Sequence, residues 1–180
     1  MGRAFETTRV PALALAECLT DLATLLDRTS DLDYLSRPDG GVSGSVGAHV
    51  RHCLDHVRAV LDAADGGLLS YDGRVRDTAL EQKRTLGILA LQQQRDRLEA
   101  LARNRADQPI RLEAQVDYRG GAVEVTSSLG RELVFVLQHT IHHQAIVALL
   151  LAARGIAIPP RFGNAPSTVQ RHAQRLASAQ

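Results

Sequence analysis

The residues best suited to chemistry in this 180-residue sequence are histidines, because six of its seven histidines lie in two short segments. The later segment, 135–150 (FVLQHTIHHQAIVALL), is otherwise apolar and contains His139, His142 and His143. Side chains four residues apart project from one face of a helix about one turn apart, so His139 and His143 are spaced to bind one metal ion. Burying two imidazoles in an apolar helix costs free energy unless their nitrogens find partners, and a shared cation provides one.

The earlier segment, 47–57 (GAHVRHCLDHV), contains His49, His52 and His56. These side chains share one face of a predicted helix, and any of them could supply a third ligand. Three protein ligands leave one coordination position of a catalytic metal open to water or substrate. The two segments together predict a metal site built between two helices.

Four segments have the apolar spacing of amphipathic or buried helices, and loops rich in glycine and proline separate them. The predicted helices cover residues 11–35, 45 to about 65, about 78 to 105, and 127 or 128 to 155. Pro11 is placed in the first turn of the first helix, and Ser45 caps the second. The histidines therefore belong to the second and fourth helices.

Residues 109–127 have a different pattern, because apolar and polar side chains alternate on both sides of Arg119-Gly120-Gly121. Alternation of this kind predicts a two-stranded hairpin, which should lie against the helices since an isolated hairpin is marginally stable. A short last helix is expected from 166 to about 177. The predicted fold class is mainly α: an antiparallel four-helix bundle with a short β-hairpin before the fourth helix and a short C-terminal helix, in one domain over 1–180.

Composition excludes several classes of function. Lys and Arg (21) nearly balance Asp and Glu (20), which leaves no basic excess to bind nucleic acid or an anionic membrane. The longest apolar run, 145–153, is shorter than the ~20 residues that span a bilayer. The N-terminus lacks the apolar core of a signal peptide, and two cysteines, Cys18 and Cys53, suit a reducing compartment. We expect a cytoplasmic protein that binds neither nucleic acid nor membranes.

The motif Ser45-x-Gly47-x-x-x-x-His52, followed later by His139-x-x-His142-His143, resembles the DinB-like superfamily. The resemblance extends over essentially the whole chain, including the tail FGNAPST. In that family one histidine of the second helix and two of a later helix bind a divalent metal. The resemblance therefore implies His52, His139 and His143 as the ligands, with zinc or nickel as the metal and iron as a third option.

One departure from the family pattern limits which functional residues of the family can be assigned to this sequence. Many members have Arg-Gly-Gln directly after the last histidine, whereas this chain has Gln144-Ala145-Ile146. Spacing alone allows His49 or His56 as the ligand from the second helix, and only the resemblance selects His52. We interpret His49 as a hydrogen-bonded residue or a residue at the rim of the site, where it would contact substrate. We interpret His142 as a supporting or interface residue, and His172 as a surface residue.

The loop after the second helix contains Tyr71, Arg74 and Arg76, which we interpret as substrate-binding residues at the border of the pocket. The arginines could pair with a substrate carboxylate, and an exposed, solvated loop is the equally weighted alternative. Glu132 lies two turns before His139, where it could orient a ligand or take a proton. It could also be a first-turn acid favoured by the helix dipole.

A metal held by three neutral imidazoles keeps its full charge, and it would activate a bound water or a thiolate. Relatives implied by the resemblance include transferases that use low-molecular-weight thiols, maleylpyruvate isomerases and the metal-binding domain of sulfoxide synthases. We predict a metal-dependent thiol transferase or hydrolase of stress or detoxification metabolism, acting on a small molecule with a thiol as a potential cofactor. The alternatives are a non-catalytic metal-binding or metal-sensing protein and a metal-free bundle. Surplus apolar surface on the fourth helix leaves room for a homodimer.

Overall fold

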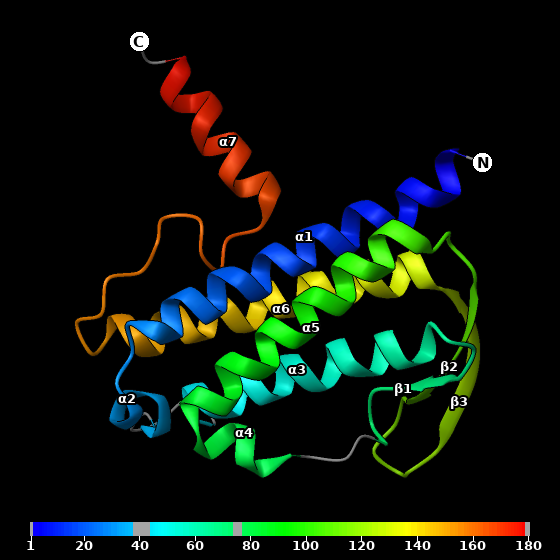
Figure 1. Ribbon diagram of the computed structural model, residues 1–180, viewed down its shortest axis with the longest axis horizontal. Coiled ribbons are helices and arrows are strands. Elements are labelled where there is room, and N and C mark those ends of the chain that lie inside the picture. The colour runs from blue at the N-terminus through cyan, green and yellow to red at the C-terminus, as the bar shows by residue number, and fades with distance from the viewer. Residues whose placement is uncertain (1, 38–43, 74–76, 179–180) are drawn as a thin grey trace.

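The fold is built on four long helices, which pack side by side (Figure 1). The computed structural model describes residues 2–37, 44–73 and 77–178. The long helices are α1 (Gly2–Asp27), α3 (Val46–Ala63), α5 (Arg84–Asn104) and α6 (Leu129–Ala152). In Figure 1, α1 and α6 run from right to left, whereas α3 and α5 run from left to right. The predicted mainly helical bundle is confirmed, and α3 and α6, the two histidine helices, are antiparallel neighbours.

The first predicted helix has different boundaries in the structure. α1 begins at Gly2 rather than at Pro11, and it ends at Asp27, after which a separate short helix, α2 (Asp31–Leu35), follows. Pro11 therefore lies inside α1 instead of opening it. A proline inside a helix costs one backbone hydrogen bond. Thr8 and Ala12 are both fully buried, so this part of α1 packs against the bundle.

The third predicted helix is divided in two. α4 (Thr78–Gln82) ends at Lys83, whose backbone is extended, and α5 begins directly after it. Asp77 caps α4 by accepting a hydrogen bond from the Ala79 N–H. The last helix, α7 (Pro166–Ala177), is confirmed, and it extends away from the bundle (Figure 1).

The predicted hairpin is confirmed as strands β2 (Pro109–Gln115) and β3 (Ala122–Ser128), which pair antiparallel with Leu112 opposite Val125. A third strand, β1 (Leu68–Ser70), was not predicted; it pairs parallel with β2 and places Leu69 opposite Leu112. Three residues are too few to show the alternation that identifies a strand. The sheet lies at the end of the bundle where α3 ends and α6 begins (Figure 1).

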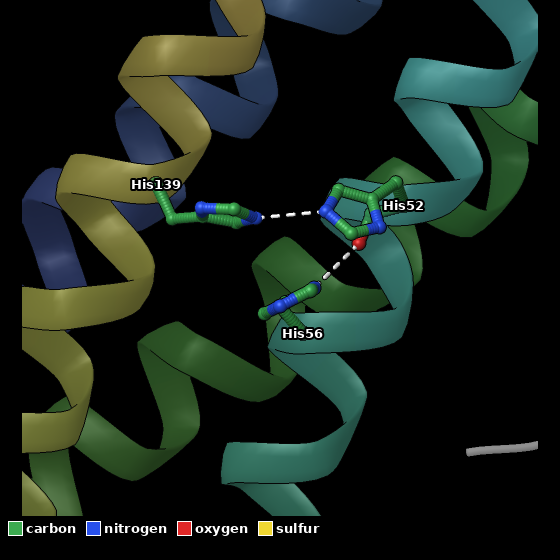
Figure 2. A group of neighbouring side chains, drawn as sticks. All are labelled: His52, His56 and His139. Carbon is green, nitrogen blue, oxygen red and sulfur yellow. Dashed lines mark hydrogen bonds between the residues drawn. The ribbon is translucent and has the colours of Figure 1, made fainter. Parts of the chain in front are cut away.

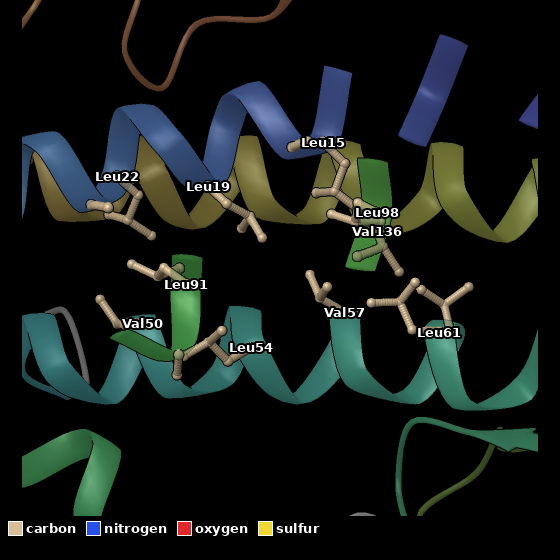
Figure 3. Close-up of a cluster of buried hydrophobic side chains, with 14 of the residues drawn as sticks. Leu15, Leu19, Leu22, Val50, Leu54, Val57, Leu61, Leu91, Leu98 and Val136 are labelled. Carbon is tan, nitrogen blue, oxygen red and sulfur yellow. The ribbon is translucent and has the colours of Figure 1, made fainter. Parts of the chain in front are cut away.

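Leucine and valine side chains from all four long helices fill the core (Figure 3). On α3, the core residues Val50, Leu54 and Val57 are fully buried. Each such side chain contributes roughly 1.5–3 kcal/mol when it leaves water. The core fixes the rotation of α3 about its axis, and so it determines where the neighbouring histidine face points.

The beginning of α3 is held close to α4. Ser45 caps α3 by accepting a hydrogen bond from the Ala48 N–H at 3.2 Å. A Cβ atom at Gly47 would lie 2.2 Å from the carbonyl oxygen of Glu81, so only glycine fits between the two helices. Tyr34, fully buried, donates its hydroxyl to the Leu80 carbonyl at 2.6 Å and ties α2 to the same corner.

Among the described helices, α6 is long and apolar enough to cross a membrane on the criteria of length and composition. A core helix of a bundle has the same properties. α6 packs on α1 and α3 and fully buries Leu133 and Val136, while 28% of its apolar window is buried.

Candidate metal centre

Five histidines of α3 and α6 form one histidine cluster between the two helices: His49, His52, His56, His139 and His143. The i, i+4 spacing on each helix presents one column of imidazoles to the other. Because the helices are antiparallel, the end of α3 that carries His49 faces His143 of α6, while the end that carries His56 faces His139. The two segments that the sequence identified are therefore brought together.

His52, His56 and His139 form the tightest part of the histidine cluster. One nitrogen from each lies within 4.8 Å of the others, an arrangement that could hold a metal ion. The Nε2 atoms of His52 and His139 are 2.8 Å apart (Figure 2). Nitrogens at that distance can share a proton, or they can bind one cation at ~2.0–2.1 Å each.

The ring of His56 is fixed by its own helix. Its Nδ1 lies 2.9 Å from the backbone carbonyl of His52 (Figure 2). A carbonyl only accepts, so Nδ1 carries the proton and Nε2 carries the lone pair. That tautomer suits a metal ligand, since ligating histidines commonly donate their other N–H to a carbonyl or carboxylate.

His143, one of the three ligands expected from the resemblance, lies against the same pair of rings. Its centroid is 4.5 Å from that of His52 and 4.6 Å from that of His139. Burial, followed by the neighbouring His139, lowers the pKa of His143 to about 3, so its imidazole is neutral at physiological pH. The expected set and the tightest group share His52 and His139, and the role of His143 as a ligand stays a prediction.

His49 is the partner of His143. Their Nδ1 atoms are 3.0 Å apart, which makes one of them a donor and the other an acceptor. His49 is only 8% exposed, and its Nε2 has no hydrogen-bond partner in the described part of the chain. Burial, and then His142, lower its pKa. This contact agrees with the interpretation of His49 as a hydrogen-bonded residue, and its contact with substrate stays a prediction.

Two aromatic rings border the histidine cluster. Tyr71 stacks on His56 with ring centroids 5.0 Å apart, and Phe135 stacks on His139 at 5.8 Å. The tyrosine and phenylalanine also contact each other at 5.2 Å. These rings cover one side of the imidazoles, and Arg131 lies over the outer face of Phe135, 5.5 Å from its centroid.

Glu132 is fully buried beside these rings. It accepts hydrogen bonds from Tyr71 at 2.9 Å, from Ser127 at 2.5 Å and from Arg131 at 2.7 Å. Burial, followed by the charge of Glu132, raises the pKa of the Tyr71 phenol. Three donors offset part of the free-energy cost of burying this carboxylate. Glu132 lies in the first turn of α6, as one of the two interpretations expects, and its role in proton transfer stays a prediction.

The remaining predicted residues are placed as follows. Tyr71 borders the histidine cluster, whereas Arg74 and Arg76 lie outside the described residues. His142 is exposed and contacts His143 with ring centroids 5.3 Å apart, and His172 is exposed on α7. A cleft of about 870 Å³ runs along a neighbouring flank of α3, where Arg58 and Asp77 are among its lining residues.

Sequence reasoning did not identify Phe135 or Ser127 as parts of the site. Phe135 precedes His139 by four residues, and this spacing could have indicated the stacking. The sequence allows Ser127 or Ser128 to begin the fourth helix; in the structure Ser128 caps α6, whereas Ser127 donates a hydrogen bond to Glu132. Which of the two serines caps the helix depends on where β3 ends.

Comparison with known proteins identifies a family for most of the chain. The family model described as DinB superfamily matches residues 14–147, which include both histidine segments. FK506-binding protein 5 of Rhizopus delemar is 32% identical over 104 residues, which is 57% of this chain and 27% of that protein. The chain thus spans about a quarter of that relative, and the relative's name describes the whole of it. No solved structure matches.

Proposed function

The chain belongs to the DinB superfamily, and we propose that it is a metal-dependent enzyme whose histidine cluster activates a low-molecular-weight thiol or a water molecule. One observation carries the proposal: His52 and His56 of α3 meet His139 of α6 with ligand atoms within 4.8 Å of one another. The donors fit a divalent cation. They are imidazoles, at least one is fixed in a tautomer with a lone pair on Nε2, and neighbouring His143 is neutral.

Zinc and nickel are the cations that this donor set suits best, with iron as a third, since imidazole binds all of them. A divalent cation held there would act as a Lewis acid toward a thiol or a water molecule. The protein's own contribution is to hold the imidazoles in place and to exclude solvent from one side through Tyr71 and Phe135.

We propose that the substrate is a small molecule that approaches along the loop after β1. Tyr71 brings this loop against His56, and Arg74 and Arg76 follow within five residues. Either arginine could pair with a carboxylate of a thiol cofactor or of its acceptor. Glu132 holds Tyr71 in place through the 2.9 Å hydrogen bond, and its proposed role is to position that ring. A cytoplasmic location and a homodimer remain part of the proposal.

Metal analysis of the purified protein is the first test. We expect one equivalent of a divalent metal in the wild type and loss of binding in His139→Ala, with His172→Ala as a matched control on the exposed C-terminal helix. The metal-loaded protein is then assayed with several low-molecular-weight thiols and electrophiles, and with hydrolysable esters and amides. Absence of metal from the wild type, after exposure to zinc, nickel and iron, would contradict the proposal.

The second candidate is a protein that binds or senses a metal without turnover. The position of His143 beside the His52–His139 pair favours it, because a fourth imidazole would close the coordination of a four-coordinate ion. Tight metal binding with no activity toward any thiol, electrophile, ester or amide would support this candidate over the enzyme.

A further inference from the structure

The His52–His139 pair has a histidine on each side of it. His56 lies 4.4 Å from His52 and 4.3 Å from His139, between ring centroids. His143 lies at nearly the same distances, 4.5 and 4.6 Å. His56 lies one turn after His52, and His143 lies one turn after His139. Because α3 and α6 are antiparallel, these two residues lie on opposite sides of the pair along the bundle (Figure 1). The ring centroids of both flanking residues are therefore similarly close to the pair, while the ligand atoms that lie within 4.8 Å of one another are those of His52, His56 and His139.

Both flanking rings have their Nδ1 atom engaged outside the pair. Nδ1 of His56 contacts the carbonyl of His52 at 2.9 Å, and Nδ1 of His143 contacts Nδ1 of His49 at 3.0 Å. In the tautomer in which His143 is the donor of this contact, its lone pair lies on Nε2, as in His56. A second contact of this kind is what orients a ligating histidine.

We propose that the metal centre has four imidazole ligands, His52, His56, His139 and His143, rather than three. This inference rests on the proposed metal binding and adds a ligand from α3. Four imidazoles, those of the His52–His139 pair and of the two flanking histidines, suit an ion that accepts more than four ligands, such as nickel, iron or cobalt. Such an ion would keep coordination positions open for substrate. Zinc, which prefers four ligands in closed sites, would be bound without an open position.

The proposal makes His56 and His143 equivalent in metal binding, and this equivalence can be measured. Apo-protein is titrated with Co²⁺ and Ni²⁺ in competition with a chelator, for the wild type, His56→Ala, His143→Ala and the double variant. Each single variant is expected to retain one equivalent with affinity lowered at least about tenfold, and the double variant to lose binding. His172→Ala, on the exposed C-terminal helix, is the matched control. Circular dichroism of each apo-variant establishes that it is folded.

The visible spectrum of the Co²⁺ form is a second readout that does not depend on activity. The wild type is expected to show the weak d–d absorption of five- or six-coordinate cobalt, and each single variant a changed spectrum. If one of the single variants keeps the affinity and spectrum of the wild type while the other loses the metal, the centre has three ligands and the inference is wrong. If the wild type binds no metal at all, the proposed function fails as well, so the two failures are distinguishable.

Discussion

At the scale of single residues, the histidine cluster is governed by the two nitrogens of each imidazole. A buried nitrogen without a partner costs about 1–3 kcal/mol, so every contact in the cluster restricts the tautomers of the next ring. The His52 carbonyl determines the tautomer of His56, and His49 restricts that of His143. While His49 contacts His143 through Nδ1, its buried Nε2 has no hydrogen-bond partner in the described part of the chain, which costs free energy.

Replacing His49 tests whether it orients His143. His49→Ala removes the contact to Nδ1 of His143, so the affinity for Co²⁺ or Ni²⁺ should fall about 10–100-fold while the stoichiometry stays at one. Competition with a chelator measures the change. Unchanged affinity in this variant would show that His143 needs no such support, and His172→Ala serves as the control.

Tyr71 has two separable contacts, its ring on His56 and its hydroxyl on Glu132. Tyr71→Phe keeps the ring and removes one of three donors to a fully buried carboxylate. We expect the free energy of unfolding to fall by roughly 1–3 kcal/mol, with metal content unchanged. Urea denaturation measures the free energy of unfolding, and metal analysis measures the metal content. Tyr118→Phe is the matched control because Tyr118 is fully exposed; an equal effect in both variants would contradict the assignment.

At the scale of elements, α3 serves two purposes with two faces. Val50, Leu54 and Val57 pack into the core, and the histidines lie on the adjacent face. Ser45 fixes where the helix starts, and Gly47 allows α4 to approach its first turns. A shift of α3 by a fraction of a turn would separate His52 from His139, so the α3–α4 corner supports the site from outside it.

Gly47→Ala tests this corner. Its Cβ would overlap the Glu81 carbonyl, a backbone atom that cannot move away without displacing α4. We expect a loss of about 1–3 kcal/mol in the free energy of unfolding, measured by urea denaturation. In contrast, Gly67→Ala should be nearly neutral, because the nearest atom to a Cβ there is 3.9 Å away. Equal stability of Gly47→Ala and wild type would show that the corner is not tightly packed.

At the scale of the whole molecule, burial keeps two thiols protonated. Desolvation raises the pKa of Cys18 and of Cys53 to about 12, from an ordinary value of 9.0. Both are free cysteines, and Cys53 is 1% exposed. The thiolate is the reactive form, so neither side chain is suited to act as a nucleophile at neutral pH.

The raised pKa values of the two thiols make the free energy of unfolding depend on pH. Above pH 9.0 the unfolded chain loses thiol protons that the folded chain keeps up to about pH 12, so the free energy of unfolding should fall as pH rises through this window. Urea denaturation at about pH 8 and about pH 10 measures the decline. Alkylation by iodoacetamide at about pH 8 should be slow in the folded protein and rapid in urea. Fast labelling of Cys53 in the folded protein would contradict its burial.

The sequence by itself determined the four long helices, the hairpin and the two histidine segments, because these depend on local spacing. The repeat of 3.6 residues predicts which side chains share a face, and His139 and His143 follow from that repeat alone. The sequence could not determine α1 upstream of Pro11, the break at Lys83 or strand β1, because packing against distant residues decides each of them.

Only the tertiary structure decided which histidines meet. Spacing on α3 left His49, His52 and His56 as alternatives. The antiparallel packing of α6 gave them different neighbours: His143 for His49, His139 for His56, and both for His52. The physical reason is that a helical repeat fixes the face on which a side chain lies but not the partner it meets across an interface. That partner depends on the axial register of two helices, which the hydrophobic core and the α3–α4 corner determine.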